Sequence, residues 1–294
     1  MRYGAVAQLT AQRGWSLLLV GALTVLSPVM SYAQLVPVTS PPKDSTKPEG
    51  LFTLSDALLF GGFLVGAAVA RPLDTKIATR IREPSAQLNH FASTAAKSFN
   101  FYGSPGVAIA SVAMYGVGRV AHIDRLADLG LHSTEAIVLS AGITYVIKGL
   151  VGRERPNTAG VNEPNDFHFG KGFTSGTYSS FPSGHATAAF AAATVVTVET
   201  HQWWPKSTWF VAPIMFGTAS MVGVARLYTN NHWASDVIVG AGIGTLTGLK
   251  VFRYNHVTHK NTRLNTWLLR AVPDVAPDFD GHGATIGWSF AAPR

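Results

Sequence analysis

The sequence contains no cysteine and only a few charged residues. Because none of the 294 residues is a cysteine, disulfide bonds, thiolate nucleophiles and cysteine-ligated zinc are excluded. Charged residues make up 13% of the chain, which is few for a soluble protein, whereas 47% of the residues are hydrophobic, which excludes a disordered chain. Any chemistry must therefore use other side chains, and the low charge content means that a membrane protein has to be weighed against a soluble one.

Strand-like alternation is also scarce, and six apolar segments dominate the pattern. Prolines, glycines or charges bound each segment, so the sequence predicts an all-α protein, a bundle of six main apolar helices. Most segments have 12 to 14 residues between polar boundaries, whereas a membrane-spanning helix needs about 20, so length favours a buried bundle. The glycines of GAGIG indicate close helix packing rather than a dinucleotide loop, because no strand precedes them. The segments are approximately 57–70, 105–118, 136–147, 186–198, 208–225 and 237–249.

Composition divides the chain into four parts. Residues 1–33 resemble an export signal, with an uncleaved membrane anchor as the alternative. Residues 34–50 are a proline-rich linker, residues 51–271 are the expected helical catalytic domain, and residues 272–294 are an irregular tail in which ATIGWSF is strand-like. Cleavage of the signal would remove two arginines and no acidic residue, lowering the formal charge from +7 to +5. This charge is too small to indicate a nucleic-acid partner.

Two islands of polar residues lie near segment ends in the middle of the chain. In KGLVGRERP, Lys148 and Arg155 are seven residues apart and share a helix face, although cations near a helix C-terminus are also favoured by the helix dipole. In PSGH, Ser183, Gly184 and His185 open a helix, where free backbone N–H groups bind anions. An N-capping serine beside a hydrogen-bonded histidine is the simpler alternative.

A third island, ARLYTNNHWASD, contains Arg226, His232 and Asp236. Asp236 lies four positions after His232, so on a helix the carboxylate can hold one ring nitrogen while the other faces a reactant; a histidine and an aspartate that merely begin a helix are the alternative. Together the islands predict phosphoryl transfer, in which cations neutralise phosphate oxygens, one histidine attacks phosphorus and the other transfers protons. This scheme needs no cofactor, and no acidic cluster indicates a metal.

The three strings resemble a known signature. K-x6-R-P at 148–156, P-S-G-H at 182–185 and R-x5-H-x3-D at 226–236 look like the three motifs of the type 2 phosphatidic acid phosphatase (PAP2) superfamily, which includes lipid phosphate phosphatases, bacterial class A acid phosphatases and vanadium haloperoxidases. The resemblance implies a helical bundle of the PAP2/haloperoxidase type. It also implies that His185 is the nucleophile, that His232 is the general acid/base and that Asp236 orients His232. The implied phosphate ligands are Lys148, Arg155, Ser183, Gly184 and Arg226.

The resemblance implies a metal-independent phosphatase that forms a phosphohistidine intermediate and acts on lipid phosphates or small organic phosphates. The alternatives are a haloperoxidase with vanadate as its cofactor and a non-catalytic helical envelope protein. One departure is visible, because the third motif usually begins Ser-Arg and here Ala225 precedes the arginine. The insert 157–181, with Asn165, Asp166, His168 and Lys171, is expected to cap the pocket, with a plain surface loop as the alternative.

The location of the protein follows from an argument about topology. If the chain has an N-terminal export signal and all six segments span the membrane, the motif loops face the cytoplasm. A six-span protein with its active site outside the cell therefore conflicts with the export signal. The sequence therefore favours an exported, periplasmic enzyme, either soluble or associated with a membrane surface, and leaves a multi-pass inner-membrane protein as the alternative. It does not set the oligomeric state.

Overall fold

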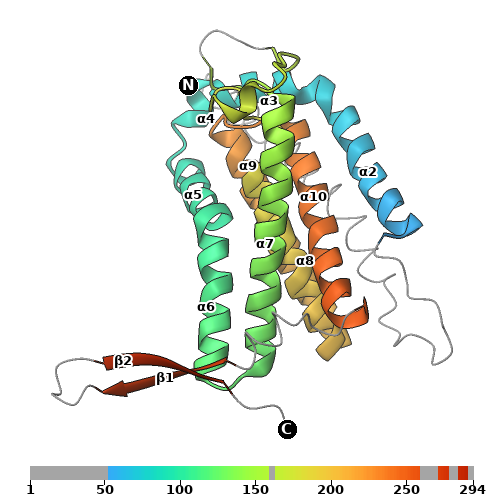
Figure 1. Ribbon diagram of the computed structural model, residues 1–294. Helices are drawn as coiled ribbons and strands as arrows, with labels where there is room; N and C mark the ends of the chain where they lie inside the picture. Colours follow the sequence, from blue (N-terminus) through green and yellow to red (C-terminus); the bar gives the residue numbers. More distant parts are fainter. Residues whose placement is uncertain (1–51, 159–162, 259–270, 278–283, 291–294) are drawn as a thin grey trace.

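The computed structural model describes residues 52–158, 163–258, 271–277 and 284–290 (Figure 1), so the expected export signal and linker lie outside the described residues. Short turns η1 (Arg71–Leu73), η2 (Tyr102–Gly106), η3 (Lys171–Phe173), η4 (Pro205–Ser207) and η5 (Tyr254–Thr258) join or extend the helices. The helices are α2 (Leu54–Ala70), α3 (Asp74–Arg82), α4 (Pro84–Gln87), α5 (His90–Phe101), α6 (Val107–Val120), α7 (Asp124–Val151), α8 (Gly184–Trp203), α9 (Thr208–Tyr228) and α10 (Ala234–Arg253).

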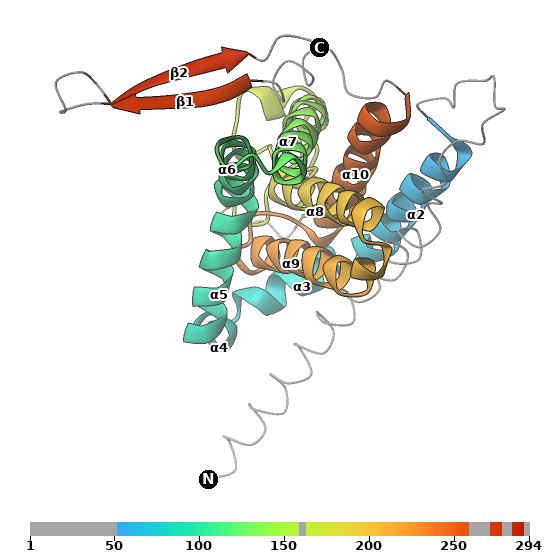
Figure 2. The ribbon, with the colours of Figure 1, turned by 90° about the horizontal axis from the view of Figure 1, so that it is seen from below.

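Helix α8 lies at the centre of the bundle and contacts α6, α7, α9 and α10 (Figure 2). Its alanine-rich sequence explains this position, because small side chains let neighbouring helices approach closely. The glycines of α10 have the same effect. A Cβ atom at Gly240 would lie 2.6 Å from the backbone oxygen of Ser183, and one at Gly242 would lie 2.8 Å from the Cβ of Phe63. The expected close packing of the GAGIG helix is therefore confirmed.

The six predicted segments correspond to α2, α6, α7, α8, α9 and α10, and the all-α bundle is confirmed. Their predicted lengths were wrong. The third segment, expected at 136–147, is part of α7, which has 28 residues and continues through His132 and Lys148. Polar side chains inside the helix were read as boundaries, because the sequence does not show that partners in the bundle satisfy them.

Among the residues that the structure describes, four helical stretches are long and apolar enough to cross a membrane, which overturns the argument from short segments. Large apolar side chains also point outward on α2, α6, α7 and α9, and such extensive apolar surface fits contact with lipid. Membrane association is therefore consistent with both helix length and surface. The stretches are Leu54–Arg82, Asp124–Val151, Pro205–Tyr228 and Ala234–His256. The outward side chains include Leu58, Val65, Val69, Ile109, Val112, Val138, Ile143, Val146, Trp209, Phe210 and Ile214.

A two-stranded hairpin follows the bundle and lies beside the end of α6 (Figure 1). β1 (Ala271–Pro277) pairs antiparallel with β2 (Ala284–Phe290), with Ala271 opposite Phe290. β2 coincides with the strand-like ATIGWSF, whereas β1 replaces what was expected to be irregular chain. The prolines of β1 suggested a loop, but both strands of a two-stranded sheet are edge strands, and edge strands tolerate proline.

Candidate active site

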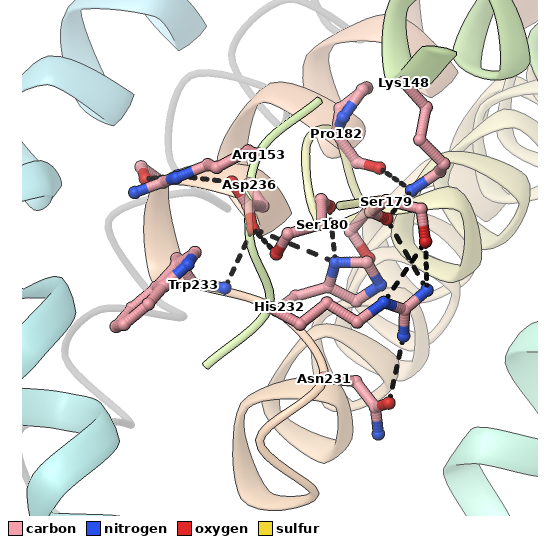
Figure 3. Close-up of polar contacts among 12 residues, drawn as sticks. Lys148, Arg153, Ser179, Ser180, Pro182, Asn231, His232, Trp233 and Asp236 are labelled. Carbon is pink, nitrogen blue, oxygen red and sulfur yellow. Dashed lines mark hydrogen bonds and ion pairs between the residues drawn. The ribbon is translucent and has the colours of Figure 1, made fainter. Parts of the chain in front are cut away.

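The three polar islands meet at one end of the bundle, where α7 ends, α8 begins, and the loop between α9 and α10 crosses (Figure 3). Helix α7 ends at Gly152, whose positive φ of 58° reverses the chain and directs the segment after it across the site. A Cβ atom at Gly152 would collide with the backbone oxygen of His168, so the close approach also requires glycine.

Three cations line this end, and their side chains are held by neutral oxygens. Lys148 Nζ donates to the backbone oxygens of Ser179 at 2.6 Å and Pro182 at 2.8 Å. Arg155 donates to Ser179 Oγ at 3.0 Å and to Asn231 Oδ1 at 3.1 Å. Because these partners are uncharged, they position the cations without cancelling their charge, which leaves a site suited to an anion.

The third cation is Arg226, near the end of α9. Its Nη1 donates to Asn100 Oδ1 at 3.0 Å, so a residue of α5 that the sequence reading did not single out positions this arginine. Its Nε is buried and has no hydrogen-bond partner in the described parts of the chain. A buried charged donor that lacks a partner is costly unless a ligand completes its hydrogen bonds.

Ser183 stands immediately before α8, but its side chain makes no capping hydrogen bond. Its Oγ is buried and, among the residues described, has no partner. The simpler alternative of an N-capping serine is therefore not what the structure contains. Gly184 begins the helix, and a Cβ atom there would only touch the methyl group of Thr144 at 3.8 Å. The hydroxyl and the free N–H groups of the first helical turn thus remain available to an anion.

His185 follows in the first turn of α8 and is half-buried. Burial, together with the nearby cations Arg226, Arg155 and Lys148, lowers the pKa of His185 to about 4. The imidazole is therefore neutral at physiological pH. A neutral ring carries the lone pair that a nucleophile needs.

His232 does not interact with Asp236 in the way the i, i+4 spacing predicted. Its Nδ1 lies 2.6 Å from the backbone oxygen of Ser180 and 3.9 Å from Asp236 Oδ2, and the second distance is too long for a hydrogen bond. The spacing argument assumed a helix, but α10 begins only at Ala234. Burial lowers the pKa of His232 to about 3, although the carboxylate of Asp236 opposes this shift.

Ser180 connects the histidine to the aspartate. Its hydroxyl donates to Asp236 Oδ2 at 2.5 Å while its backbone oxygen accepts from His232 Nδ1 (Figure 3). The same carboxylate oxygen accepts from the backbone N–H of Trp233 at 3.0 Å. With Nδ1 as the donor, the proton of a neutral ring is fixed on this atom, and Nε2 carries the lone pair. Asp236 thus orients His232 through Ser180.

A buried ion cluster lies behind Asp236, and it was not predicted from the sequence. Arg153, 2% exposed, donates to Asp236 Oδ1, to Asp74 Oδ2 at 2.9 Å and to Ser235 Oγ at 2.8 Å. Asp74 also accepts from the backbone N–H of Ser235 at 3.0 Å. Arg153 lies within the GRERP string, so its position in the first polar island was a signal from which its place in the site could have been predicted. Asp74 lies in α3, well before the three strings, and nothing in the local sequence marks it.

The insert 157–181 takes part in the site mainly through its last residues, Ser179 and Ser180. The residues expected to form a cap lie elsewhere. Asn165 accepts a hydrogen bond of 2.8 Å from Arg71 at the end of α2, and Asp166 pairs with His168 at 2.9 Å. Lys171 lies 5.0 Å from the centre of the Tyr178 ring. None of these contacts reaches the two histidines.

Residues 130–260 match the model of the PAP2 superfamily, and this range contains all three strings. The chain is also similar to the lipid A 1-phosphatase of Porphyromonas gingivalis, with 38% identity over 140 residues, which cover 48% of this chain and 27% of that protein. The chain therefore spans about a quarter of the length of the relative that it matches.

Two solved structures resemble the bundle. A transmembrane PAP2-type phosphatidylglycerolphosphate phosphatase from Bacillus subtilis is 23% identical, with a TM-score of 0.52 over 72% of this chain and 99% of that one. LpxE from Aquifex aeolicus is 20% identical, with a TM-score of 0.42 over 62% and 96%. The likeness to the first structure confirms the expected PAP2-type helical fold.

Proposed function

We propose that the chain is a PAP2-type phosphatase that hydrolyses a lipid phosphomonoester without a metal ion. The observation that carries this proposal is the meeting of Lys148, Arg155 and Arg226 with two histidines at one end of an apolar bundle. Each cation is positioned by neutral groups. The buried Ser183 Oγ and Arg226 Nε, which lack partners in the described structure, are donors suited to phosphate oxygens.

In the first step, the three cations and the start of α8 bind the non-bridging oxygens of the phosphate. The neutral ring of His185 attacks phosphorus, and a P–N bond forms as the P–O bond to the leaving alkoxide breaks. His232 gives a proton to that oxygen. In the second step, His232 takes a proton from water, the water oxygen attacks phosphorus, and the P–N bond breaks to release inorganic phosphate and free His185.

The substrate itself prepares His232 for the role of acid. In the free site, Lys148 and Arg226 oppose protonation of this ring, in addition to the effect of burial. A bound phosphate dianion compensates these cations, so the pKa of His232 rises when substrate binds. Protonation is then coupled to the presence of a leaving group that needs the proton.

A lipid is favoured over a soluble phosphate for two reasons. The relatives similar to this chain are named for lipid A and for phosphatidylglycerolphosphate, which are both lipids. The outer faces of α2, α6, α7 and α9 are apolar, so acyl chains could remain beside the helices while the headgroup enters the site. We therefore place the protein in a membrane through its long helices, in place of the soluble periplasmic form that the sequence favoured.

Extraction tests the membrane part of the proposal. Membranes washed with alkaline carbonate should retain the full chain, and a mild detergent should release it. Release by carbonate alone would favour the soluble or surface-bound periplasmic form instead. Because extraction does not depend on activity, this result tests the proposed membrane location separately from the proposed chemistry.

Phosphate release tests the chemistry. The purified full chain in detergent, with a chelator present, should release inorganic phosphate from phosphatidate and from a lipid A analogue much faster than from a soluble aryl phosphate. His185→Gln should abolish the release. His201→Gln is a matched control, because this histidine lies on the same helix and hydrogen-bonds Thr208 at 2.6 Å. Loss of activity in the chelator while the protein stays folded would contradict the metal-independent mechanism.

A further inference from the structure

A second cluster of polar side chains lies far from the phosphate site. It consists of His132 on α7, Glu199 on α8 and His256 on η5, the turn that continues α10. His132 and Lys148 are 16 residues apart on α7, which at 1.5 Å per residue puts the cluster about 24 Å from the catalytic end of that helix. The cluster is therefore separate from the site that binds phosphate.

The three side chains converge on a single point. Nδ1 of His132 lies 2.6 Å from Glu199 Oε1, and Nε2 of His256 lies 2.7 Å from the same oxygen. Their possible ligand atoms all lie within 4.8 Å of one another. Ligand atoms on a tetrahedral metal with bonds of about 2.1 Å are about 3.4 Å apart. To admit an ion, each nitrogen–oxygen distance has to lengthen by about 0.7–0.8 Å, and the widest separation has to shorten by at most about 1.4 Å.

Burial and charge make this arrangement costly without a cation. The side chains of His132 and Glu199 are both 0% exposed, and two neutral imidazoles leave the carboxylate charge of Glu199 uncompensated in the interior. Asp128 lies near enough to interact electrostatically with all three residues, and its carboxyl group brings further negative charge. A divalent cation would neutralise this charge.

Two polar atoms of the cluster that lack partners in the described structure also favour a bound cation. Glu199 Oε2 and His132 Nε2 are buried and have no hydrogen-bond partner within the described ranges. An ion pair with a protonated His132 would leave Nε2–H as an unsatisfied buried donor of a charged ring. Coordination at Nδ1 leaves the same N–H without a partner but on a neutral ring, which costs less, and Glu199 Oε2 is then available as a second oxygen for the metal.

We propose that His132, Glu199 and His256 bind one divalent transition-metal ion, with Zn²⁺ the best fit. Two imidazoles and one carboxylate form a ligand set that suits Zn²⁺, and a water molecule would complete four coordination positions. The ion would join α7, α8 and the end of α10 at the part of the bundle remote from catalysis. Its role is to hold the helices together, so the phosphatase chemistry does not pass through it.

The test measures metal content and thermal stability of the full chain, purified in detergent with an affinity tag that contains no histidine. After treatment with a chelator and its removal, the protein should take up one Zn²⁺ per chain, determined by mass spectrometry of the metal, and its Tm should rise. Co²⁺ at the same site should give the visible absorption of a tetrahedral complex. Uptake of less than one Zn²⁺ per chain at saturating metal, with an unchanged Tm, would overturn the proposal.

Two variants and a control show where the metal binds. His256→Gln removes a ligand whose side chain is 19% exposed at a helix end, and Glu199→Gln keeps a hydrogen-bonding amide in place of the carboxylate. Each should weaken Zn²⁺ binding at least 100-fold and abolish the rise in Tm, while His201→Gln binds as the natural protein does. Equal uptake by all four proteins would overturn the site. Because none of these readouts is phosphate release, failure here is distinguishable from failure of the proposed phosphatase.

Discussion

Replacing Arg153 by methionine tests the ion cluster that supports Asp236. Methionine keeps an apolar side chain in this place but removes the guanidinium that pairs with the buried carboxylates of Asp74 and Asp236, both 0% exposed. Breaking a buried ion pair by removing one partner costs about 3–5 kcal/mol, because the remaining charge stays buried. We expect a loss of about 4 kcal/mol, which at about 2–4 °C per kcal/mol corresponds to a fall in Tm of about 8–16 °C.

The assay is thermal unfolding of the full chain in detergent, with Arg80→Met as the matched control. Arg80 forms an ion pair of 2.9 Å with Glu83, but both side chains are largely in solvent, so its removal should cost less than about 1 kcal/mol. Adding Asp74→Asn to Arg153→Met removes one of the two stranded carboxylates. The double variant should therefore be about 1–3 kcal/mol more stable than the sum of the single effects.

The reasoning would be refuted in either of two ways. Arg153→Met could unfold within a degree or two of Arg80→Met, which would mean that the buried carboxylates do not need the guanidinium. Alternatively, Asp74→Asn and Arg153→Met could be additive, which would mean that the two groups do not interact. Activity gives an independent readout, because freeing Asp236 loosens Ser180 and hence His232, and we expect kcat to fall while KM changes little.

Three further predictions concern the phosphate site. The value of kcat/KM should fall below about pH 4, where His185 becomes protonated. Arg155→Gln should move this fall to higher pH, because it removes a cation that lowers the pKa of His185. A pH dependence unchanged in Arg155→Gln would contradict this prediction. Ser183→Ala should lower kcat/KM about tenfold with little change in Tm, since its Oγ has no partner in the described structure and is free to bind phosphate; an equal kcat/KM would exclude that role. Asn100→Ala should lower phosphate affinity by loosening Arg226, measured by inhibition with inorganic phosphate, and unchanged inhibition would show that the arginine needs no such support.

The sequence sufficed to predict the parts of the site that local chemistry specifies. Cations and histidines at segment ends, at spacings typical of a helix face or a helix start, identified the residues that converge in the structure. It also predicted the helical class, because apolar segments without alternation leave few other folds.

The parts of the site that the sequence did not predict depend on contacts between distant segments. Asp74 and Asn100 bind site residues from α3 and α5, and no pattern in their own neighbourhood records this. The length of α7 was underestimated because the charged Glu135 and Lys148 bounded the predicted segment, yet both lie inside the helix and have partners in Asn255 and Ser179. The link from Asp236 to His232 through Ser180 depends on the path of a loop, which spacing along the chain does not encode.

The most direct test of the account is to look for phosphate on His185 during turnover. The full chain is mixed with a lipid carrying radioactive phosphate and quenched within milliseconds. We predict an acid-labile, base-stable label on the peptide that contains His185, and none in His185→Gln, which should release no phosphate. Label on another residue, or full phosphate release by His185→Gln, would contradict the mechanism.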